Sequence, residues 1–292
     1  MYVKDMKTKS YFQKILVPVD GSHSCFHAKM LAALIAKKFQ SNVTVIHVVA
    51  HEFMHPELKA QHRLPPSILH EIENSYLKAG RKIIRTAEEL FREEGIEVDA
   101  RLITYEDPAE TALQLVKEEG YDLVVIGNRA KNQAERFSLG SVAEKVARHA
   151  ACPVLIAKQK PKKITKMLAA IDGSKHAYKA LEYAVQLAQK HNSKITLLNV
   201  EEDKLFRLEP KAIEGVGKSI LCDAATKIKE VDFDKRLEFG SPAETIIKVA
   251  KKENYDLIIV GSRGLSSVKR FFLGSVSDDV SMHARCSVLI VR

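Results

Sequence analysis

The sequence predicts an α/β fold of two tandem domains, each a doubly wound, five-stranded parallel sheet flanked by helices. Its 292 residues are about twice the length of a common domain. The two halves of the chain repeat the same segments, and within each half short apolar runs alternate with stretches of helical period. This alternation is typical of a parallel sheet with right-handed crossovers. We therefore expect one domain over residues 1–160 and a second over 161–292, with the polar segment 159–163 as the linker.

The internal repeat is visible as matched segments. Residues 14–22 (KILVPVDGS) match residues 166–174 (KMLAAIDGS) at an offset of 152 residues, and residues 107–129 match residues 241–263 at an offset of 134. The smaller second offset means that the first copy carries about 18 extra residues. We place this insert between residues 50 and 85.

The first half of the second copy contains two strands and two helices. A short apolar run ends at Asp172-Gly173-Ser174, as a buried strand does when a turn follows. Apolar residues then recur with the helical period until His191-Asn192, which end the helix. The expected elements are a strand at 167–171, a helix from about residue 177, a strand at 195–200 and a helix around 213–228.

The second half of this copy begins with a short strand at 234–240 and a marked helix start. In Ser241-Pro-Ala-Glu244, serine is a good N-cap, proline suits the first helical position and glutamate closes a capping box. Asp107-Pro-Ala-Glu110 predicts the same helix start in the first copy. The remaining expected elements are a continuous apolar strand at 256–261, a helix at 275–283 and a last strand at 287–291.

Composition excludes several classes of protein. No apolar run approaches the roughly 20 residues of a membrane helix. The polar, basic start MYVKDMKTKSYFQK lacks the apolar stretch of a secretory signal, so we expect a cytoplasmic protein. The net charge of +9 favours anionic partners such as nucleotides or nucleic acid. The basic residues are spread along the chain and are not interleaved with aromatics, which argues against nucleic acid.

The four cysteines form no CxxC pair and no zinc spacing. In a reducing compartment we expect Cys25, Cys152, Cys222 and Cys286 to be small buried apolar residues.

One segment resembles a metal motif. Residues 51–55 read H-E-x-x-H, which in a zinc protease lies inside a helix. Here it directly follows the apparent strand 43–49, and Pro56 disfavours a helical residue before it. We interpret it as a polar loop that enters the helix of the insert. Metal binding stays open as an alternative, because three more histidines lie nearby at His47, His62 and His70.

The expected ligand edge is the carboxyl end of the parallel strands, where the strand order reverses. Asp172 ends the first strand of the second copy, Val200 ends the second and Gly261 ends the fourth. We expect these residues to lie together.

A candidate phosphate loop follows the fourth strand. Gly261-Ser-Arg-Gly264 is separated by nine residues from Gly274-Ser275, which opens a helix. Glycine permits positive φ and a close approach of the backbone to a ligand. The N–H groups and dipole of a helix N-terminus attract phosphate, and Arg263 can add a charge-assisted contact. The pattern favours a polyphosphate held by backbone amides.

This G-x2-G-x9-G-S pattern, with an aspartate ending the first strand, resembles the ATP-binding pattern of the universal stress protein family. The IDGS, SPAE, DLIIVGSRG and LGSVSDDV segments are also similar to that family, and the resemblance covers nearly the whole chain. It implies two adenine nucleotide alpha hydrolase-like domains. It also implies that the last strands of the two copies, around 154–156 and 288–290, pair with each other. A homodimer is a further possible assembly.

The resemblance implies specific ligand contacts in the second copy. Asp172 and the backbone of Val200 would face adenine and ribose. Gly261, Arg263 and Gly264 would line the ribose and phosphates, and Gly274, Ser275 and Val276 would surround the phosphates. The cofactor that it implies is ATP, often with Mg or Mn.

The first copy departs from the pattern, because Ala130 stands where the second copy has Gly264. If that position needs positive φ, alanine costs about 1 kcal/mol, and its methyl group could also block a phosphate. The first copy retains Asp20, Val48, Gly127, Arg129, Gly140 and Ser141. We therefore expect ATP binding chiefly in the C-terminal copy.

These observations lead to one main hypothesis and two alternatives. The main one is a nucleotide-dependent stress-response regulator that binds ATP. One alternative is an interaction scaffold without nucleotide, of which Ala130 would be a first sign. The other is a slow ATPase, although the chain has no GxxxxGK[ST] segment and no paired catalytic set.

Overall fold

The computed structural model describes residues 11–50, 65–128, 139–160, 163–202, 210–265 and 273–292. The N-terminal copy has the elements β1 Lys14–Pro18, α1 His23–Phe39, β2 Asn42–Ala50, α3 Pro66–Glu93, β3 Val98–Glu106, α4 Pro108–Glu119, β4 Leu123–Gly127, α5 Ser141–His149 and β5 Val154–Ala157. The C-terminal copy has β6 Lys166–Ala170, α6 Lys175–His191, β7 Lys194–Glu201, α8 Pro210–Thr226, β8 Phe233–Phe239, α9 Pro242–Lys252, β9 Leu257–Gly261, α10 Ser275–His283 and β10 Ser287–Val291.

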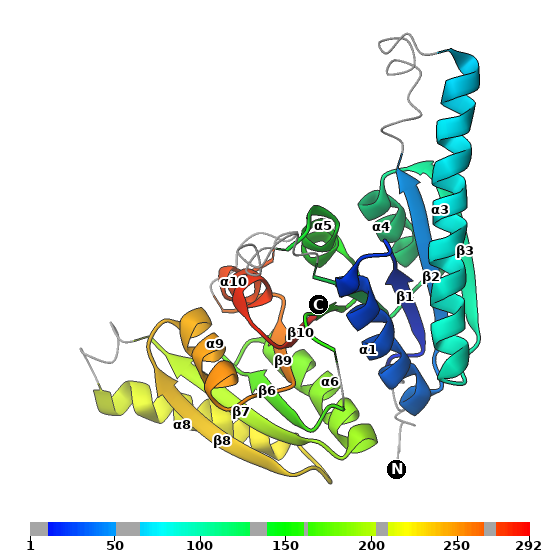
Figure 1. The fold of residues 1–292 in the computed structure, drawn as a ribbon. Helices are drawn as coiled ribbons and strands as arrows, with labels where there is room; N and C mark the ends of the chain where they lie inside the picture. The colour runs from blue at the N-terminus through cyan, green and yellow to red at the C-terminus, as the bar shows by residue number, and fades with distance from the viewer. Residues whose placement is uncertain (1–10, 51–64, 129–138, 161–162, 203–209, 266–272) are drawn as a thin grey trace, which may run out of the picture.

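The ten strands of the described chain form one sheet, in the order β3-β2-β1-β4-β5-β10-β9-β6-β7-β8. Pairing is parallel within each copy (Figure 1). The chain order reverses between β1 and β4 in the first copy and between β6 and β9 in the second. Each copy is therefore doubly wound, as predicted, and has its own switch point for a ligand.

The two copies join through their last strands. β10 pairs with β5 in the antiparallel sense, with Val288 opposite Ile156, Leu289 opposite Leu155 and Ile290 opposite Val154. The expected pairing is confirmed. It covers two apolar strand edges that would otherwise be open to association with other chains.

Helices cover both faces of this sheet, and each face has its own core. One core contains residues of α1, α3, α6 and α8, while the other contains residues of α4, α5, α9 and α10. Successive strand residues alternate between them: Leu155 belongs to the first core and Ile156 to the second. Both cores continue across the β5–β10 seam, so the two copies share their hydrophobic interior.

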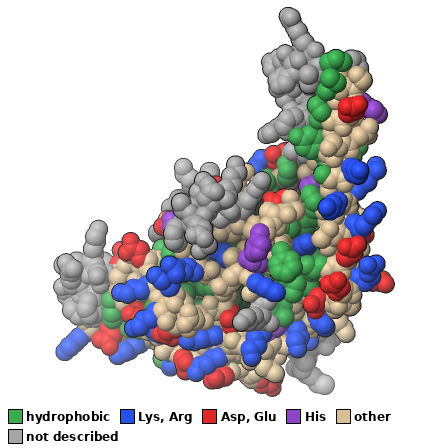
Figure 2. Space-filling model, viewed as in Figure 1, with side chains coloured by type: hydrophobic (Ala, Val, Ile, Leu, Met, Phe, Trp, Pro, Cys, Tyr) green, Lys and Arg blue, Asp and Glu red, His purple; other side chains and the backbone are tan. Residues whose placement is uncertain are grey.

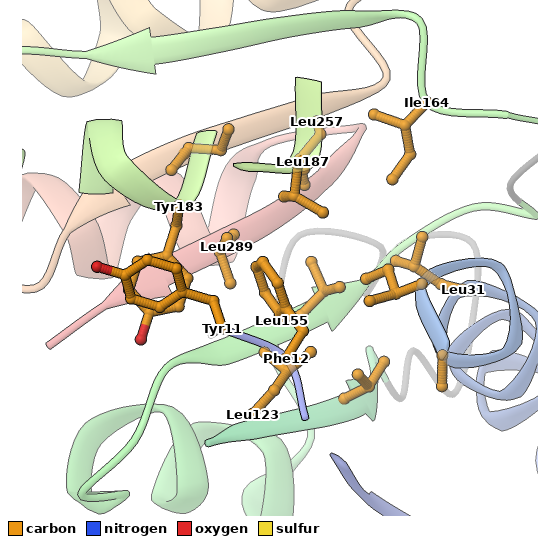
Figure 3. Packing of buried hydrophobic residues seen from close by; sticks show 14 of the residues in the cluster. Tyr11, Phe12, Leu31, Leu123, Leu155, Ile164, Tyr183, Leu187, Leu257 and Leu289 are labelled. Carbon is orange, nitrogen blue, oxygen red and sulfur yellow. The ribbon is translucent and has the colours of Figure 1, made fainter. Parts of the chain in front are cut away.

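Two aromatic residues before β1 strengthen this junction (Figure 3). The ring of Tyr11 lies 4.3 Å from that of Tyr183 of α6, and the ring of Phe12 lies 5.3 Å from it. The Tyr11 hydroxyl also donates to Glu182 at 2.6 Å. The N-terminal segment therefore packs on the C-terminal copy before the first strand begins.

The insert lengthens a helix. α3 has 28 residues, whereas its counterpart α8 has 17, and Figure 1 shows α3 extending beyond the sheet. The H-E-x-x-H segment at 51–55 lies outside the described residues. Within those residues, no group of three or more His, Cys, Asp or Glu side chains could hold a metal ion, and no helix is long and apolar enough to cross a membrane.

Two local predictions are wrong. Ser241 is the N-cap of α9 but its side chain makes no capping hydrogen bond, so the expected capping box is absent there. Asp107 does cap α4, accepting from the Glu110 N–H at 2.7 Å. Cys222 is exposed on α8, because it lies on the solvent side of an amphipathic helix, whereas the other three cysteines are buried.

Candidate functional site

The aspartate at each switch point is fixed by a local turn. The Asp172 Oδ1 atom accepts the Ser174 N–H at 2.9 Å, and Asp20 Oδ1 accepts the Ser22 N–H at the same distance. The glycine between them has φ of +83° in the second copy and +76° in the first, which favours glycine. The serine then caps the following helix, α6 or α1. The Asp-Gly-Ser sequence thus places a carboxylate at the end of the first strand.

Hydrogen bonds hold both ends of the candidate phosphate loop in the second copy. The Ser262 N–H donates to Val291 O at 2.7 Å, and the Gly274 N–H donates to Ser262 O at 2.8 Å. The Ser277 hydroxyl donates to Gly261 O at 2.5 Å. The entry of the loop and the start of α10 therefore lie together at the end of β9. Residues 266–272, including the basic pair Lys269-Arg270, lie outside the described part of the chain.

The loop glycines serve close approach and not positive φ. Gly261, Gly264 and Gly274 do not have positive φ. The backbone at the position of Gly264 therefore does not require glycine for its conformation. A Cβ on Gly264 would lie 2.6 Å from Asp172 Oδ2. A Cβ on Gly261 would lie 2.6 Å from the His176 carbonyl carbon of α6. Gly264 therefore makes room for the carboxylate, whereas Gly261 lets a helix pack closely on its strand.

Gly127 has the same packing role in the first copy. A Cβ there would lie 2.6 Å from the Ser24 carbonyl oxygen of α1. The other loop residues of this copy, Arg129 and Ala130, lie outside the described residues.

The helices α5 and α10 begin without a capping side chain. Their N-caps are Gly140 and Gly274, with φ of −64° and −67°, and neither start has a side-chain cap bond. The first-turn N–H groups of a helix have no partner within the helix. In the second copy these include the N–H groups of Ser275 and Val276. Because Ser141 and Ser275 are exposed, their hydroxyls can reach an anion at the same helix end.

A cavity of about 230 Å³ lies at the switch point of the first copy. It brings together five of the predicted residues of that copy: Asp20, Val48, Gly127, Gly140 and Ser141. The sequence placed the better site in the second copy, so this cavity is an unexpected feature of the first.

His47 also lines this cavity and was not among the predicted ligand contacts. Its Nδ1 lies 2.7 Å from Val19 O, so the ring is anchored to the end of β1. The counterpart in the second copy is Asn199, whose side-chain amide donates to Ile171 O at 2.9 Å. The sequence did contain a signal, because His47 directly precedes Val48 on the same strand end.

The polar groups behind the two sites are incompletely paired. Asn128 Oδ1 in the first copy and Ser262 Oγ in the second are buried without a hydrogen-bond partner in the described chain. Both follow directly on the fourth strand of their copy. Burial lowers the pKa of His176, which packs against Gly261, and the charge of Arg263 lowers it further.

Together, the fold and these sites define a tandem, doubly wound α/β protein. In each half, an aspartate and an uncapped helix N-terminus lie at the same sheet edge. The chain matches the model of the universal stress protein family twice, over residues 11–158 and 163–292. It belongs to that family, as a member with two tandem domains.

The chain is similar to curated proteins and to solved structures. A curated Staphylococcus aureus relative that carries the universal stress protein name is 36% identical over 137 residues, which cover 43% of this chain and 82% of the relative. A universal stress protein structure from Archaeoglobus fulgidus covers 96% of this chain and 98% of its own, with a TM-score of 0.71 at 23% identity. A universal stress protein solved in complex with cAMP covers 44% of this chain and 97% of its own, with 25% identity and a TM-score of 0.36.

Proposed function

We propose that this universal stress protein binds an adenine nucleotide such as ATP, and that it acts in the cytoplasm as a nucleotide-dependent stress-response regulator. One observation carries the proposal. At each switch point, an aspartate held by an Asp-Gly-Ser turn lies at the same sheet edge as a helix that begins at Gly-Ser with no side-chain cap. A carboxylate suits ribose hydroxyls, and free helix N–H groups suit phosphates.

The C-terminal copy is proposed as the principal site. Asp172 and the backbone of Val200 would hold the nucleoside, while Gly274, Ser275 and Val276 would hold the phosphates. Gly264 supports this choice, because its missing Cβ leaves room for the Asp172 carboxylate. Arg263 adds positive charge beside the phosphates. When bound, Mg or Mn would neutralise phosphate charge at this edge.

The N-terminal copy is proposed as a second site. Its cavity of about 230 Å³ reaches from Val48 and His47 to Gly140 and Ser141, which is the direction from nucleoside to phosphates in the proposed arrangement. Small-molecule pockets typically have volumes of about 300–1,000 Å³. The cavity is smaller than this range and therefore suits part of a nucleotide.

Isothermal titration calorimetry with paired variants tests the proposal. Gly274→Val in the second copy should abolish the principal ATP-binding event, because a branched side chain would cover the first-turn N–H groups of α10. The fold should survive, since a Cβ at this position meets its nearest atoms at 3.4 Å, an ordinary contact. Gly140→Val is the matched control for the first copy. Unchanged affinity in both variants would exclude these sites.

The same titration separates the alternatives. Wild-type protein that binds no ATP, ADP or cAMP would support an interaction scaffold instead. Phosphate release that persists after exhaustive purification and is lost in Gly274→Val would support a slow ATPase. We also propose that the chain assembles into a homodimer, and sedimentation with and without ATP should then show a species of twice the mass of one chain.

A further inference from the structure

Two arginines follow the ends of the neighbouring strands β9 and β10, at the edge of the second site. The Ser262 N–H donates to Val291 O at 2.7 Å, so the next residue on each strand, Arg263 and Arg292, follows this bond. The same Ser262 carries the bond to Gly274 at the start of α10. Arg292 therefore stands at the edge where the phosphates of a nucleotide are proposed to lie. Figure 1 places this end of the chain between the two copies.

These two guanidinium groups, here called the guanidinium pair, have few partners. The Arg292 Nη2 donates to Ala147 O, near the end of α5. The Nε atoms of Arg263 and Arg292 are both buried without a hydrogen-bond partner, and neither residue has an ion pair within the described ranges. By contrast, Arg101, Arg148 and Arg236 each contact a carboxylate.

Two neighbouring cations with buried donors are unfavourable without an anion. Burial lowers the pKa of Arg292, and the charge of Arg263 lowers it further. A guanidinium group presents a planar fork of donors that matches phosphate oxygens. A phosphate group between the arginines would satisfy the unpaired donors and neutralise the repulsion.

We propose that Arg292, with Arg263, binds the terminal phosphates of the nucleotide in the C-terminal copy and makes this site prefer triphosphates to monophosphates. The inference rests on the proposed function, because it assigns a residue to the same site. It goes beyond that function by assigning a role to Arg292, and by stating which nucleotides the site binds with the highest affinity.

The first copy provides an internal comparison. Lys158 follows β5 as Arg292 follows β10, and the matching backbone bond runs from the Asn128 N–H to Ala157 O at 3.0 Å. The Lys158 Nζ donates to Met282 O at 2.7 Å, and burial lowers its pKa to about 8. Arg129 stands at the position of Arg263 in this copy and lies outside the described residues, so the described difference at this pair is Lys158 in place of Arg292. An ammonium offers a phosphate a point charge, whereas a guanidinium offers a planar fork of donors. We therefore assign the preference for triphosphates over monophosphates to the second copy.

Calorimetry with ATP, ADP and AMP on the full-length protein tests the assignment. In Arg292→Ala the ratio of ATP affinity to AMP affinity should fall about tenfold, because one charge-assisted contact to phosphate is lost. AMP affinity should change less than twofold. Arg292→Lys should retain part of the ratio, and Lys158→Ala, the matched control, should leave it unchanged. Thermal unfolding of each variant reports its stability, and Arg263→Ala provides a second variant of the same pair.

The outcomes are distinguishable. An unchanged ratio in Arg292→Ala and Arg263→Ala, or an equal loss for all three nucleotides, would overturn the role of the guanidinium pair while leaving nucleotide binding intact. Wild-type protein that binds none of the nucleotides would overturn the proposed function, and this inference with it.

Discussion

The two copies have the same framework but different ligand edges. Both have five parallel strands in the same order, an Asp-Gly-Ser turn after the first strand and an uncapped helix after the fourth. The first copy encloses a cavity lined by His47, where the second copy has Asn199. The second copy has Arg292 and His176 where the first has Lys158 and Ser24. The comparison teaches that the repeated residues build the scaffold, while the residues that differ set what each edge can bind. Figure 2 shows Lys and Arg side chains interspersed with Asp and Glu on the face in view, without a single basic patch.

The largest effect should come from a glycine whose role is the same in both copies. In Gly261→Ala or Gly127→Ala, the new Cβ would lie 2.6 Å from helix backbone. Each change should lower the free energy of unfolding by about 2 kcal/mol or more, because neither strand nor helix can move freely. Urea unfolding measures this. A neutral substitution in one copy only would show that the two helices do not pack equally closely.

A smaller effect should come from the glycine that differs between the copies. Gly264→Ala would press on the Asp172 carboxylate, so ATP affinity of the second copy should fall about tenfold while stability changes little. The reverse exchange, Ala130→Gly, should strengthen binding to the first copy. Calorimetry of both variants checks the prediction, and an Ala130→Gly protein that binds no better would show that this position does not separate the two sites.

The next effect is pH-dependent and specific to the second copy. At the end of α6, burial lowers the pKa of His191 to about 4, with a contribution from Lys38 of α1. The pKa of a histidine in the unfolded state is about 6.5. As pH falls from about 6.5 to 4, the unfolded state therefore takes up a proton that the folded state excludes, and stability is lost in that window. The loss should be on the order of 1 kcal/mol, since the side chain is partly solvent-screened.

His191→Phe is the informative variant, because the first copy has Phe39 at the matching position. Urea unfolding at pH 7 and pH 5 should show a smaller drop in stability for this variant than for the wild type. An identical drop in both proteins would assign the acid sensitivity to other groups.

The smallest effect should come from an ion pair between the copies. Arg148 of α5 contacts Asp278 of α10, with Nη2–Oδ2 at 2.8 Å. The second copy has Met282 where the first has Arg148, so the bond has no symmetric counterpart. Both side chains are partly exposed, and a double-mutant cycle of Arg148→Met and Asp278→Asn should give a coupling of about 0.5 kcal/mol. Zero coupling would mean that the two helices are joined by packing alone.

Much of the fold could be predicted from the sequence, because local patterns determine it. The apolar run 287–291 and the helix 275–283 have the observed bounds, and the matched segments indicated the two copies. What escaped prediction depends on contacts between distant segments. Three features join residues that no local pattern connects. They are the proximity of Gly264 to Asp172, the position of His47 in a cavity, and the placement of Arg263 and Arg292 after neighbouring strands. The prediction at Ser241 failed for a local reason: serine is at the N-cap position of α9, but its side chain makes no capping hydrogen bond.

The antiparallel β5–β10 seam has a consequence for how such a protein can diversify. In an assembly of identical single-domain subunits, every substitution appears in both halves, and the halves meet only at sufficient concentration. Here one polypeptide supplies both, so the ratio of the halves is fixed and their association is intramolecular. Each half is free to acquire its own side chains at the ligand edge without altering its neighbour.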